Sequence, residues 1–350
     1  MRELRVAWLG RVEYDDGLSM QRSLAAARAA GSAPDTLLLL EHPRVITLGR
    51  GAKAGHVLWP PGLLAERGFE VHETDRGGDV TYHGPGQLVG YPILDLKPDR
   101  RDVRRYVRSI EEIMMWLAAG FGVQAGRVEG RTGVWVPGAG KLGAIGVHLA
   151  RWITTHGFAF NVRPDLRDFE AIVPCGLRDA EATSLEKLLG GRAPSLAECA
   201  RQAAAHAASV WESEAVDAPV EVETVSVAVV REPGEVLVLE RIPERGGFWQ
   251  IVTGRREPGE AAPAAAVREL FEETGFAAEV RDLGYVHSFL LGDSFARETA
   301  FAARGPAGSA PRIDPREHAR YQWVPLDEAL RRLPFAGLRR AARLALQQPT

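Results

Sequence analysis

The stretch Arg76-Gly-Gly-Asp-Val-Thr-Tyr-His-Gly-Pro-Gly-Gln87 decides how the first half of the chain is interpreted. It combines four glycines and one proline with an arginine, a tyrosine and a histidine. Glycine lets a backbone approach a ligand closely or adopt a positive φ, and proline stiffens a turn. The polar side chains are therefore presented by a loop of defined shape, which is typical of a binding site. The alternative is a β-hairpin that is closed by a tight Gly-Pro-Gly turn and binds nothing.

The composition predicts two soluble domains. A chain of 350 residues exceeds the usual size of a single core. Its hydrophobic fraction of 45% and charged fraction of 25% are ordinary, and a net charge of -3 gives no indication of nucleic-acid binding. We expect no signal peptide and no membrane span, because the sequence lacks the apolar runs that these require. Two cysteines, Cys175 and Cys199, are too few for a disulfide framework, which predicts a cytoplasmic protein.

Strand-like and helix-like patterns alternate through residues 1–213. Apolar runs at residues 36–40, 45–48 and 88–96 predict strands of a buried sheet. Asp102 is placed to cap a helix that ends at Gly120. The apolar residues of that helix recur at intervals of four and three, which predicts one core-facing stripe of Val103, Val107, Ile110, Met114 and Leu117.

A lysine and a cysteine stand out as candidate catalytic residues. Lys141 is expected at the tip of a Gly-rich connection between two strand-like runs, and Cys175 lies between Pro174 and Gly176 in a turn. A nearby ammonium lowers the pKa of a thiol and can also shuttle a proton. Lys141 can therefore activate Cys175 if the fold brings the two together. Cys199 differs, because it follows the cap Ser195 in a helix and is predicted to be a packing residue.

The chain from its first residue to about residue 213 resembles the octanoyl-(acyl carrier protein):protein octanoyltransferases. The motifs that carry the resemblance are Glu41-His-Pro, Leu48-Gly49, Asp75-Arg-Gly-Gly, Thr81-Tyr-His-Gly-Pro-Gly-Gln, Lys141 with Ala144-Ile-Gly146, His156-Gly157 and Pro174-Cys-Gly. The resemblance implies an α/β (α+β) fold like that of biotin and lipoate ligases, a mixed sheet with flanking helices. It also implies that Cys175 takes octanoyl as a thioester, with Lys141 as its acid/base partner.

The same resemblance implies an acyl pocket and two protein partners. The expected pocket residues are Arg76, Gly77, Gly78, Asp79, Val80, Thr81, Tyr82, His83, Ala144, Ile145, Gly146, Gly157, Phe158 and Ala159. Burial of each methylene contributes roughly 0.8 kcal/mol, so an apolar tunnel would supply much of the recognition. The implied donor is octanoyl-acyl carrier protein. The implied acceptors are lipoyl domains of 2-oxoacid dehydrogenase E2 subunits and the glycine cleavage H protein, and the transfer needs no cofactor.

Residues 214–220 have few large apolar side chains and are predicted to be a linker. Beyond them, β-rich runs at residues 225–230 and 235–239 flank Pro233-Gly234, which predicts a hairpin. The segment Gly254-Arg-Arg-Glu-Pro-Gly-Glu260 is followed, after seven residues, by Arg268-Glu-Leu-Phe-Glu-Glu-Thr-Gly-Phe276. A helix over residues 262–274 would place Glu269, Glu272 and Glu273 on one face. Carboxylates so close together indicate Mg²⁺ or Mn²⁺, and Arg268 is spaced to pair with Glu272.

This second pattern resembles the Nudix box, so residues 221–350 are expected to form a Nudix hydrolase domain with an α/β/α sandwich. The resemblance implies hydrolysis of a nucleoside diphosphate linked to another moiety, with Glu269, Glu272 and Glu273 as metal ligands. Glu269 is also a possible base, and the supporting residues are Gly254, Glu260 and Arg268. Residues 248–254, Glu317-His318 and residues 321–323 look most like the branch that acts on dihydroneopterin triphosphate or dATP. Glu317 is either a further ligand or base, or simply an exposed acid.

Two alternatives stay open at this point. The first domain can instead be an ATP-dependent lipoate or biotin ligase, which shares the fold and needs no cysteine. The Nudix half can instead be a regulatory module that senses a nucleotide without hydrolysing it. The Pro174-Cys-Gly context argues against the ligase, and the full set of box carboxylates argues against the sensor.

Overall fold

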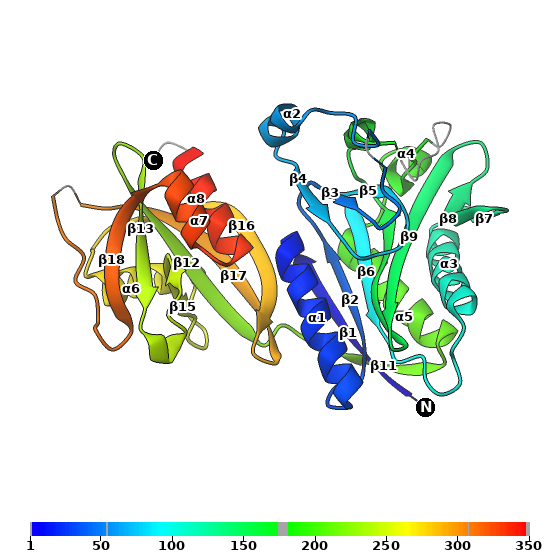
Figure 1. Ribbon diagram of the computed structural model, residues 1–350, viewed down its shortest axis with the longest axis horizontal. Helices are drawn as coiled ribbons and strands as arrows, with labels where there is room; N and C mark the ends of the chain where they lie inside the picture. The colour runs from blue at the N-terminus through cyan, green and yellow to red at the C-terminus, as the bar shows by residue number, and fades with distance from the viewer. Residues whose placement is uncertain (1, 54, 174–180, 307, 348–350) are drawn as a thin grey trace. The chain divides into compact units, whose positions relative to one another are not determined.

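The structure is a computed structural model that describes residues 2–53, 55–173, 181–306 and 308–347. The chain divides into two units, Met1–Pro219 and Val220–Thr350 (Figure 1). No helix in the described ranges is long and apolar enough to span a membrane.

The first unit is built on an eight-stranded mixed sheet with the strand order β11-β1-β2-β6-β10-β9-β8-β7. Strand β1 runs parallel to both of its neighbours, whereas the pairs from β2 to β7 are antiparallel. The strands are β1 (Arg2–Arg11), β2 (Asp35–Glu41), β6 (Gln87–Ile93), β7 (Gly126–Val128), β8 (Arg131–Val136), β9 (Gly140–Ala150), β10 (Ile153–Asn161) and β11 (Ser213–Asp217). A separate three-stranded sheet has the order β4-β3-β5, with β3 (Val45–Leu48), β4 (Glu70–Glu73) and β5 (Val80–His83).

Helices flank the large sheet of the first unit on both faces. Helix α1 (Tyr14–Ala30) lies on one side, and α3 (Val103–Gly120) and α5 (Leu196–Val210) lie on the other (Figure 1). Side chains alternate along each strand, so Leu37 and Leu39 of β2 join the core under α3 and α5. The remaining helices in the described part of this unit are α2 (Pro61–Glu66), α4 (Leu185–Leu189) and the 3₁₀ turn η1 (Leu166–Ala171). The predicted mixed sheet with flanking helices is confirmed.

The helix caps predicted at Asp102 and Ser195 are present in this unit. The side chain of Asp102 accepts a hydrogen bond from the backbone N–H of Arg105, and α3 ends at Gly120 as predicted. Ile110, Met114 and Leu117 are buried, but Val103 is 43% exposed, and Tyr106 is the residue of the first turn that packs in the core. Cys199 is completely buried in α5 behind its cap Ser195, which confirms its packing role, and burial raises the pKa of its thiol to about 12.

The predicted linker over residues 214–220 is wrong for most of its length. Ser213–Asp217 forms β11, which pairs in parallel with β1, and the backbone N–H of Ala218 donates to the carbonyl of Val6 at 2.7 Å. Four of the five side chains of β11 are exposed, so the sequence shows no alternation of buried and exposed residues, and the strand is held to β1 by its backbone. Only residues 218–221 separate β11 from the first strand of the second unit.

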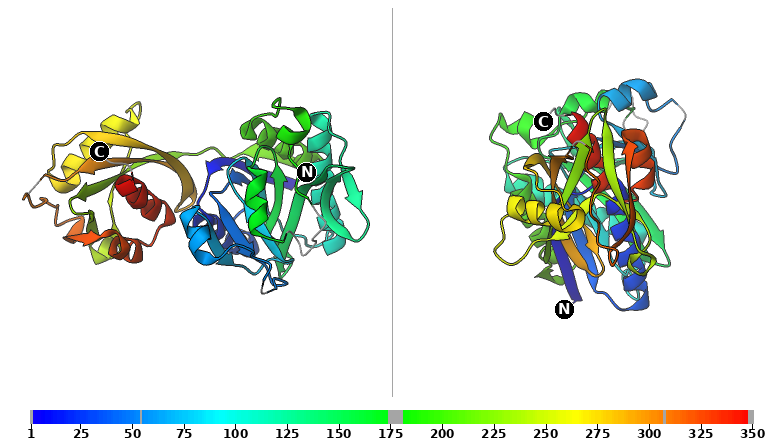
Figure 2. Two further views of the ribbon diagram at one scale, coloured as in Figure 1. Left: turned by 90° about the horizontal axis from the view of Figure 1, so that it is seen from above. Right: turned by 90° about the vertical axis from the view of Figure 1, so that its left-hand side faces the viewer.

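The second unit is a sheet between helical layers. The main strand order is β14-β13-β12-β17-β16, while β15 pairs with β12 and β18 pairs with β13. Figure 2 shows α6 (yellow) on one side of this sheet and α8 (red) on the other, each over its own apolar core. The elements are β12 (Val222–Arg231), β13 (Glu235–Arg241), η3 (Pro243–Arg245), β14 (Trp249–Gln250), β15 (Val252–Arg255), α6 (Ala262–Thr274), β16 (Val280–Leu291), β17 (Ser294–Arg304), β18 (His318–Pro325), α7 (Leu326–Arg332) and α8 (Ala336–Gln347). The predicted α/β/α sandwich is confirmed, and β12 and β13 form the predicted hairpin.

Candidate active sites

The stretch from Arg76 to Gln87 is not a hairpin. Its first strand, β5, pairs with β3 in the small sheet, whereas β6 pairs with β2 and β10 in the large sheet. The Gly-Pro-Gly turn therefore passes the chain from one sheet to the other. At Gly86, with φ of 86°, an added Cβ would stand 2.4 Å from the carbonyl oxygen of Arg163, so only glycine fits there.

The loop before β5 is held by its own arginine. Arg76 is 6% exposed, and its guanidinium donates to the carbonyl and the hydroxyl oxygen of Thr47 at 2.6 and 2.8 Å. The backbone N–H of Gly51 donates to the carbonyl of Gly78, whose φ of 88° again suits glycine. This loop is thus rigidly fixed to β3 and to the chain that follows β3.

A pocket lies where this loop meets β9 and β10. It encloses about 490 Å³ of space free of protein atoms, open solvent at its mouth included. Twelve of the fourteen predicted acyl-pocket residues line it, namely Arg76, Gly78, Asp79, Val80, Thr81, His83, Ala144, Ile145, Gly146, Gly157, Phe158 and Ala159. Three further lining residues, Tyr14, Tyr91 and His156, were not among the predicted pocket residues. Tyr14 comes from α1, so no local motif links it to the others.

Two predicted pocket residues are absent from the lining. Tyr82 is completely buried on the other side of β5, where its hydroxyl donates to Asp168 Oδ2 at 2.6 Å. The cause is the alternation of side chains along the strand, which turns Thr81 and His83 toward the pocket and Tyr82 away from it. The backbone N–H of Gly77 donates to the carbonyl of Val147 at 2.9 Å, so this residue joins the loop to β9.

Small residues let the pocket walls approach each other. Gly146 of β9 and Gly157 of β10 are register partners. A Cβ at Gly157 would stand 2.1 Å from the carbonyl oxygen of Gly90, and a Cβ at Gly146 would stand 3.0 Å from Cδ of Arg76. Larger side chains at these positions would force the strands or Arg76 to move.

Buried histidines beside the pocket are neutral. Because the carbonyl of Val12 can only accept, the Nδ1–H of His42 donates to it at 2.6 Å, and Nε2 accepts from the hydroxyl of Tyr91 at 2.7 Å. His83 Nδ1 lies 2.7 Å from Oε1 of Gln87 and donates to it. Burial lowers the pKa of His42 to about 4 and that of His83 to about 3. The pocket therefore has polar atoms at neutral pH without histidine charges.

A third histidine is paired with a carboxylate. His156 Nε2 lies 2.8 Å from Oδ1 of Asp75, and the backbone N–H of His156 donates to Gln21 Oε1 at 2.6 Å. Burial lowers the pKa of His156, and Asp75 opposes that shift. The pair places the ring of His156 at the pocket wall, next to Gly157.

Lys141 is not at the tip of a loop, as was predicted, but is the second residue of β9. Its side chain is buried, with Nζ 5.2 Å from the centre of the Trp135 ring. Its backbone N–H donates to the carbonyl of Glu181 at 2.8 Å and its carbonyl accepts from the N–H of Thr183 at 3.0 Å. Lys141 is outside the pocket lining, three residues before Ala144 on the same strand.

The predicted nucleophile Cys175 lies outside the described residues, as do Pro174 and Gly176. The described chain before them ends at Val173, whose N–H donates to the carbonyl of His56 at 2.9 Å. After them it resumes at Glu181, which is hydrogen-bonded to Lys141. The role of Cys175 stays a prediction.

Helix α6 of the second unit begins at Ala262 and ends at Thr274, as predicted, and Gly275 with φ of 70° caps it. Arg268 connects the carboxylates around this helix. Its Nη1 donates to Glu269 Oε1 at 2.7 Å and to Glu272 Oε2 at 3.1 Å, and its Nε and Nη2 each donate to Glu260 at 2.9 Å. The predicted pair of Arg268 with Glu272 is present, and Arg268 also holds two further carboxylates.

Glu269 lies against a glycine. A Cβ at Gly254 in β15 would stand 1.7 Å from Cδ of Glu269, so the carboxylate occupies the space that a side chain would fill. Burial raises the pKa of Glu269 to about 7, against the opposing effect of Arg268. A carboxylate with this pKa is suited to accept or release a proton near neutral pH.

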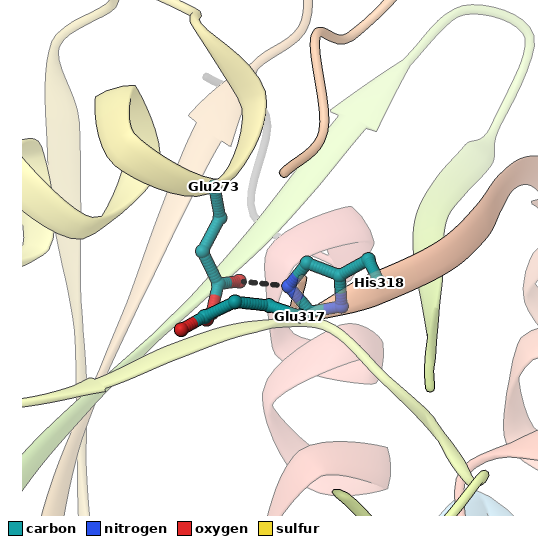
Figure 3. Close-up of side chains that lie close together, drawn as sticks. All are labelled: Glu273, Glu317 and His318. Carbon is teal, nitrogen blue, oxygen red and sulfur yellow. Dashed lines mark ion pairs between the residues drawn. The ribbon is translucent and has the colours of Figure 1, made fainter. Parts of the chain in front are cut away.

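The three predicted metal ligands of α6 do not form one cluster. Glu269 and Glu272 turn to Arg268, whereas Glu273 points toward Glu317 and His318 (Figure 3). Within the described part of the chain, only Glu273, Glu317 and His318 bring three potential ligand atoms within 4.8 Å of one another. Glu317 is therefore not an isolated exposed acid, although Arg245 Nη1 lies 3.1 Å from its Oε1.

The residues of this region fit a divalent cation. Glu273 is 5% exposed and its Oε2 atom has no hydrogen-bond partner. Hard carboxylate oxygens suit Mg²⁺ or Mn²⁺, and the space at Gly254 admits the carboxylate of Glu269 beside them. The carboxylates that would hold such an ion are Glu273 and Glu317, whereas Glu269 and Glu272 are paired with Arg268.

Comparison with known proteins agrees with this division of the chain. Residues 13–208 match the family model described as the lipoyl protein ligase A/B catalytic domain, and residues 221–344 match the NUDIX domain. The chain is 49% identical over 357 residues to an octanoyltransferase of Myxococcus xanthus, with 99% of each protein covered. It is 53% identical to an octanoyltransferase of Chloroflexus aurantiacus over 213 residues, which cover 60% of this chain and 95% of that protein.

A solved structure shares the fold of the first unit. A lipoate-protein ligase A bound with ATP superposes with a TM-score of 0.51 at 15% identity, covering 62% of this chain and 89% of that one. Because the family model matches more than half of the chain and the Myxococcus xanthus relative matches nearly all of it, both parts of the sequence are accounted for. The chain belongs to the octanoyltransferase family, within the lipoyl protein ligase A/B group, and carries a C-terminal NUDIX domain.

Proposed function

We propose that the first unit transfers octanoyl from octanoyl-acyl carrier protein to a lysine of lipoyl domains, through a thioester on Cys175. The observation that carries the proposal is the pocket between the Arg76 loop, β9 and β10, which is lined mostly by small and apolar side chains and by His83, whose pKa is lowered by burial to about 3. An uncharged acyl chain fits such a lining. Each buried methylene would contribute roughly 0.8 kcal/mol to its binding.

The chemistry runs in two transfers. The thiolate of Cys175 attacks the carbonyl carbon of the donor thioester, the bond from that carbon to the carrier sulfur breaks, and the carrier thiolate takes up a proton. The neutral amine of the acceptor lysine then attacks the Cys175 thioester, an amide forms, and the Cys175 thiolate leaves. Lys141 lowers the pKa of the Cys175 thiol in this scheme and passes protons between the thiol, the carrier sulfur and the attacking amine.

The partners follow from this reaction. The donor is octanoyl-acyl carrier protein, and the acceptors are lipoyl domains of 2-oxoacid dehydrogenase E2 subunits and the glycine cleavage H protein. No cofactor takes part in the transfer, and the reaction belongs in the cytoplasm, where two cysteines without a disulfide framework are expected. A mixture of the chain, octanoyl-acyl carrier protein and a lipoyl domain should yield octanoylated lipoyl domain without ATP. Product formation only from free octanoate and ATP would favour the ligase alternative.

We propose further that the second unit hydrolyses a nucleoside-triphosphate-like pyrophosphate of the dihydroneopterin triphosphate or dATP type. A bound Mg²⁺ or Mn²⁺ would neutralise phosphate charge there. Glu269 is the proposed base, because its pKa near 7 allows it to take a proton from the attacking water. Arg268 and Glu260 keep Glu269 and Glu272 in position.

A nucleotide panel tests this second activity. The intact chain is incubated with dihydroneopterin triphosphate, dATP and other nucleotides, with and without Mg²⁺ or Mn²⁺, and released phosphate or pyrophosphate is measured. Metal-dependent release from one member of the panel supports hydrolysis. Nucleotide binding without any release would favour the sensing module instead.

A further inference from the structure

His318 is a buried histidine with both ring nitrogens unsatisfied. It is the first residue of β18, its side chain is fully buried, and neither Nδ1 nor Nε2 has a hydrogen-bond partner. Buried polar groups nearly always have partners, so such an imidazole calls for an explanation. Its Nε2 points toward Glu273 Oε2 at 3.5 Å, an atom that also has no hydrogen-bond partner (Figure 3).

The third member of this cluster carries another negative charge. Glu317, next to His318 in the chain, has a carboxylate oxygen within 4.8 Å of the other two ligand atoms. Arg245 faces Glu317 at 3.1 Å. Among the described contacts of Glu273, by contrast, His318 is the only cationic or potentially cationic partner. The cluster thus brings together one imidazole nitrogen and two carboxylates, and a bound cation would balance the negative charge of the two carboxylates.

The distance between His318 Nε2 and Glu273 Oε2 suits two ligands of one metal ion better than a direct hydrogen bond. Metal–nitrogen and metal–oxygen bonds of roughly 2.1 Å place two ligand atoms of one ion about 3 to 4 Å apart. The distance of 3.5 Å between Nε2 and Oε2 falls in that range. An imidazole nitrogen and a carboxylate oxygen can each donate a lone pair to a cation, and at 3.5 Å these two atoms make no hydrogen bond to each other.

We propose that His318 is a metal ligand, so that the metal site of the second unit is a mixed nitrogen–oxygen site closed by Glu273 and Glu317. The inference rests on the proposed hydrolase function, which requires a divalent ion near α6. Imidazole nitrogen favours first-row transition ions, whereas an all-oxygen site suits Mg²⁺. The site therefore takes Mn²⁺ in preference to Mg²⁺.

A second buried histidine in the same unit provides a matched control. His287 is also buried and has an unpartnered Nδ1 atom. Its Nε2 atom lies 3.9 Å from Oε1 of Glu298, and His287 belongs to no three-ligand group in the described ranges. His287→Gln removes a buried imidazole without touching the proposed site.

The test measures metal ligation without measuring activity. The full chain is stripped with chelator and titrated with Mn²⁺, and free Mn²⁺ is followed by electron paramagnetic resonance, alone and in competition with Mg²⁺. Pulsed measurements on the bound ion then compare protein made with ¹⁴N-histidine and with ¹⁵N-histidine. We expect a nitrogen coupling that changes with the isotope, and a Kd for Mn²⁺ on the order of tenfold below that for Mg²⁺.

The variants assign the nitrogen. His318→Gln should abolish the coupling and raise the Kd for Mn²⁺ on the order of tenfold while changing the Mg²⁺ affinity little, and His287→Gln should keep both properties of the unaltered chain. Bound Mn²⁺ without any nitrogen coupling in the unaltered chain would overturn the proposal and leave the hydrolase function standing. Failure of both ions to bind, with or without a nucleotide, would contradict the hydrolase function itself. If His318→Gln does not fold, the isotope comparison on the unaltered chain still decides whether a histidine binds the ion.

Discussion

The carboxylate of Glu269 lies directly against the backbone of Gly254, where a Cβ atom would stand 1.7 Å from its Cδ and 2.0 Å from its Oε1. Strand β15 and helix α6 therefore meet at this point, where β15 has a glycine and α6 has the carboxylate of Glu269. Arg268 fixes the same carboxylate from the other side at 2.7 Å. The position of the Glu269 carboxylate therefore depends on the absence of a side chain at Gly254 and on the ion pair with Arg268.

Gly254→Ala should abolish most hydrolysis by the second unit. The new methyl group has to displace Glu269, and a misplacement of about 1 Å at a reacting group can reduce a rate on the order of 100-fold. The measurement is the metal-dependent hydrolysis rate on the best nucleotide of the panel. Octanoyl transfer by the same sample is the internal control and should be unchanged. Full hydrolysis in the variant would show that Glu269 does not need this position.

Lys141→Met should reduce octanoyl transfer by on the order of 100-fold or more, because the variant loses the ammonium group and keeps an apolar stem of similar length. The buried position of Lys141 beside Trp135 lets methionine pack in its place. Transfer rates are compared with those of Lys187→Met, which removes an exposed lysine from α4. Equal rates in the two variants would remove Lys141 from the proposed mechanism.

Ala159→Leu should shift the acyl preference toward shorter chains. Ala159 and its register partner Ala144 on the adjacent strand both line the pocket, so a larger side chain at position 159 fills part of the space proposed for the acyl chain. Each methylene that loses its burial weakens binding by roughly 0.8 kcal/mol, or about fourfold. Rates with butanoyl-, hexanoyl- and octanoyl-acyl carrier protein measure the shift.

The control for this variant is Ala150→Leu, which adds the same group at an exposed position of the same sheet. It should keep the octanoyl preference. An Ala159→Leu variant with the unaltered preference would place the acyl chain elsewhere.

Acid should destabilise the first unit through His42. Burial lowers its folded-state pKa from 6.5 to about 4, so between these values the unfolded chain binds a proton that the folded chain does not. The stability from His42 is complete above pH 6.5 and decreases as the pH falls toward 4, by about 1.4 kcal/mol per pH unit.

His42→Gln removes this titration. Between pH 7 and pH 5 the free energy of unfolding of the first unit should fall by about 2 kcal/mol less in the variant than in the unaltered chain. Urea unfolding, followed by hydrogen exchange of peptides from the first unit, separates this transition from that of the second unit. If the free energy of unfolding falls equally with pH in the two proteins, His42 has an ordinary pKa in the folded chain and this account of the acid sensitivity is wrong.

Elements with strong local signals could be predicted from the sequence. The bounds of α6 follow from its helical spacing and from Gly275, and the start of α3 follows from the capping side chain of Asp102. In these helices neighbouring residues carry the information. The twelve pocket residues have a different origin, because they are implied by the resemblance to the octanoyltransferases, whose motifs contain them.

Features that depend on distant pairing could not be predicted. Nothing local distinguishes a turn between two sheets from a hairpin, and the polar edge strand β11 resembles a linker because only its backbone is used. Helical spacing places Glu269 and Glu273 on one face of α6, but the carboxylate of Glu269 lies against Gly254 and pairs with Arg268, whereas that of Glu273 lies beside His318. Tyr14 and Tyr91 reach the pocket from α1 and β6, which only the tertiary structure brings together.

The central claim is a covalent octanoyl intermediate on Cys175, and intact-mass spectrometry of the chain after incubation with octanoyl-acyl carrier protein tests it most directly. The account predicts a mass increase equal to one octanoyl group, located on the peptide that contains Cys175. It also predicts that the increase disappears on addition of a lipoyl domain and is absent in Cys175→Ala. An unmodified mass during active transfer, or a Cys175→Ala variant that still transfers octanoyl, would contradict it.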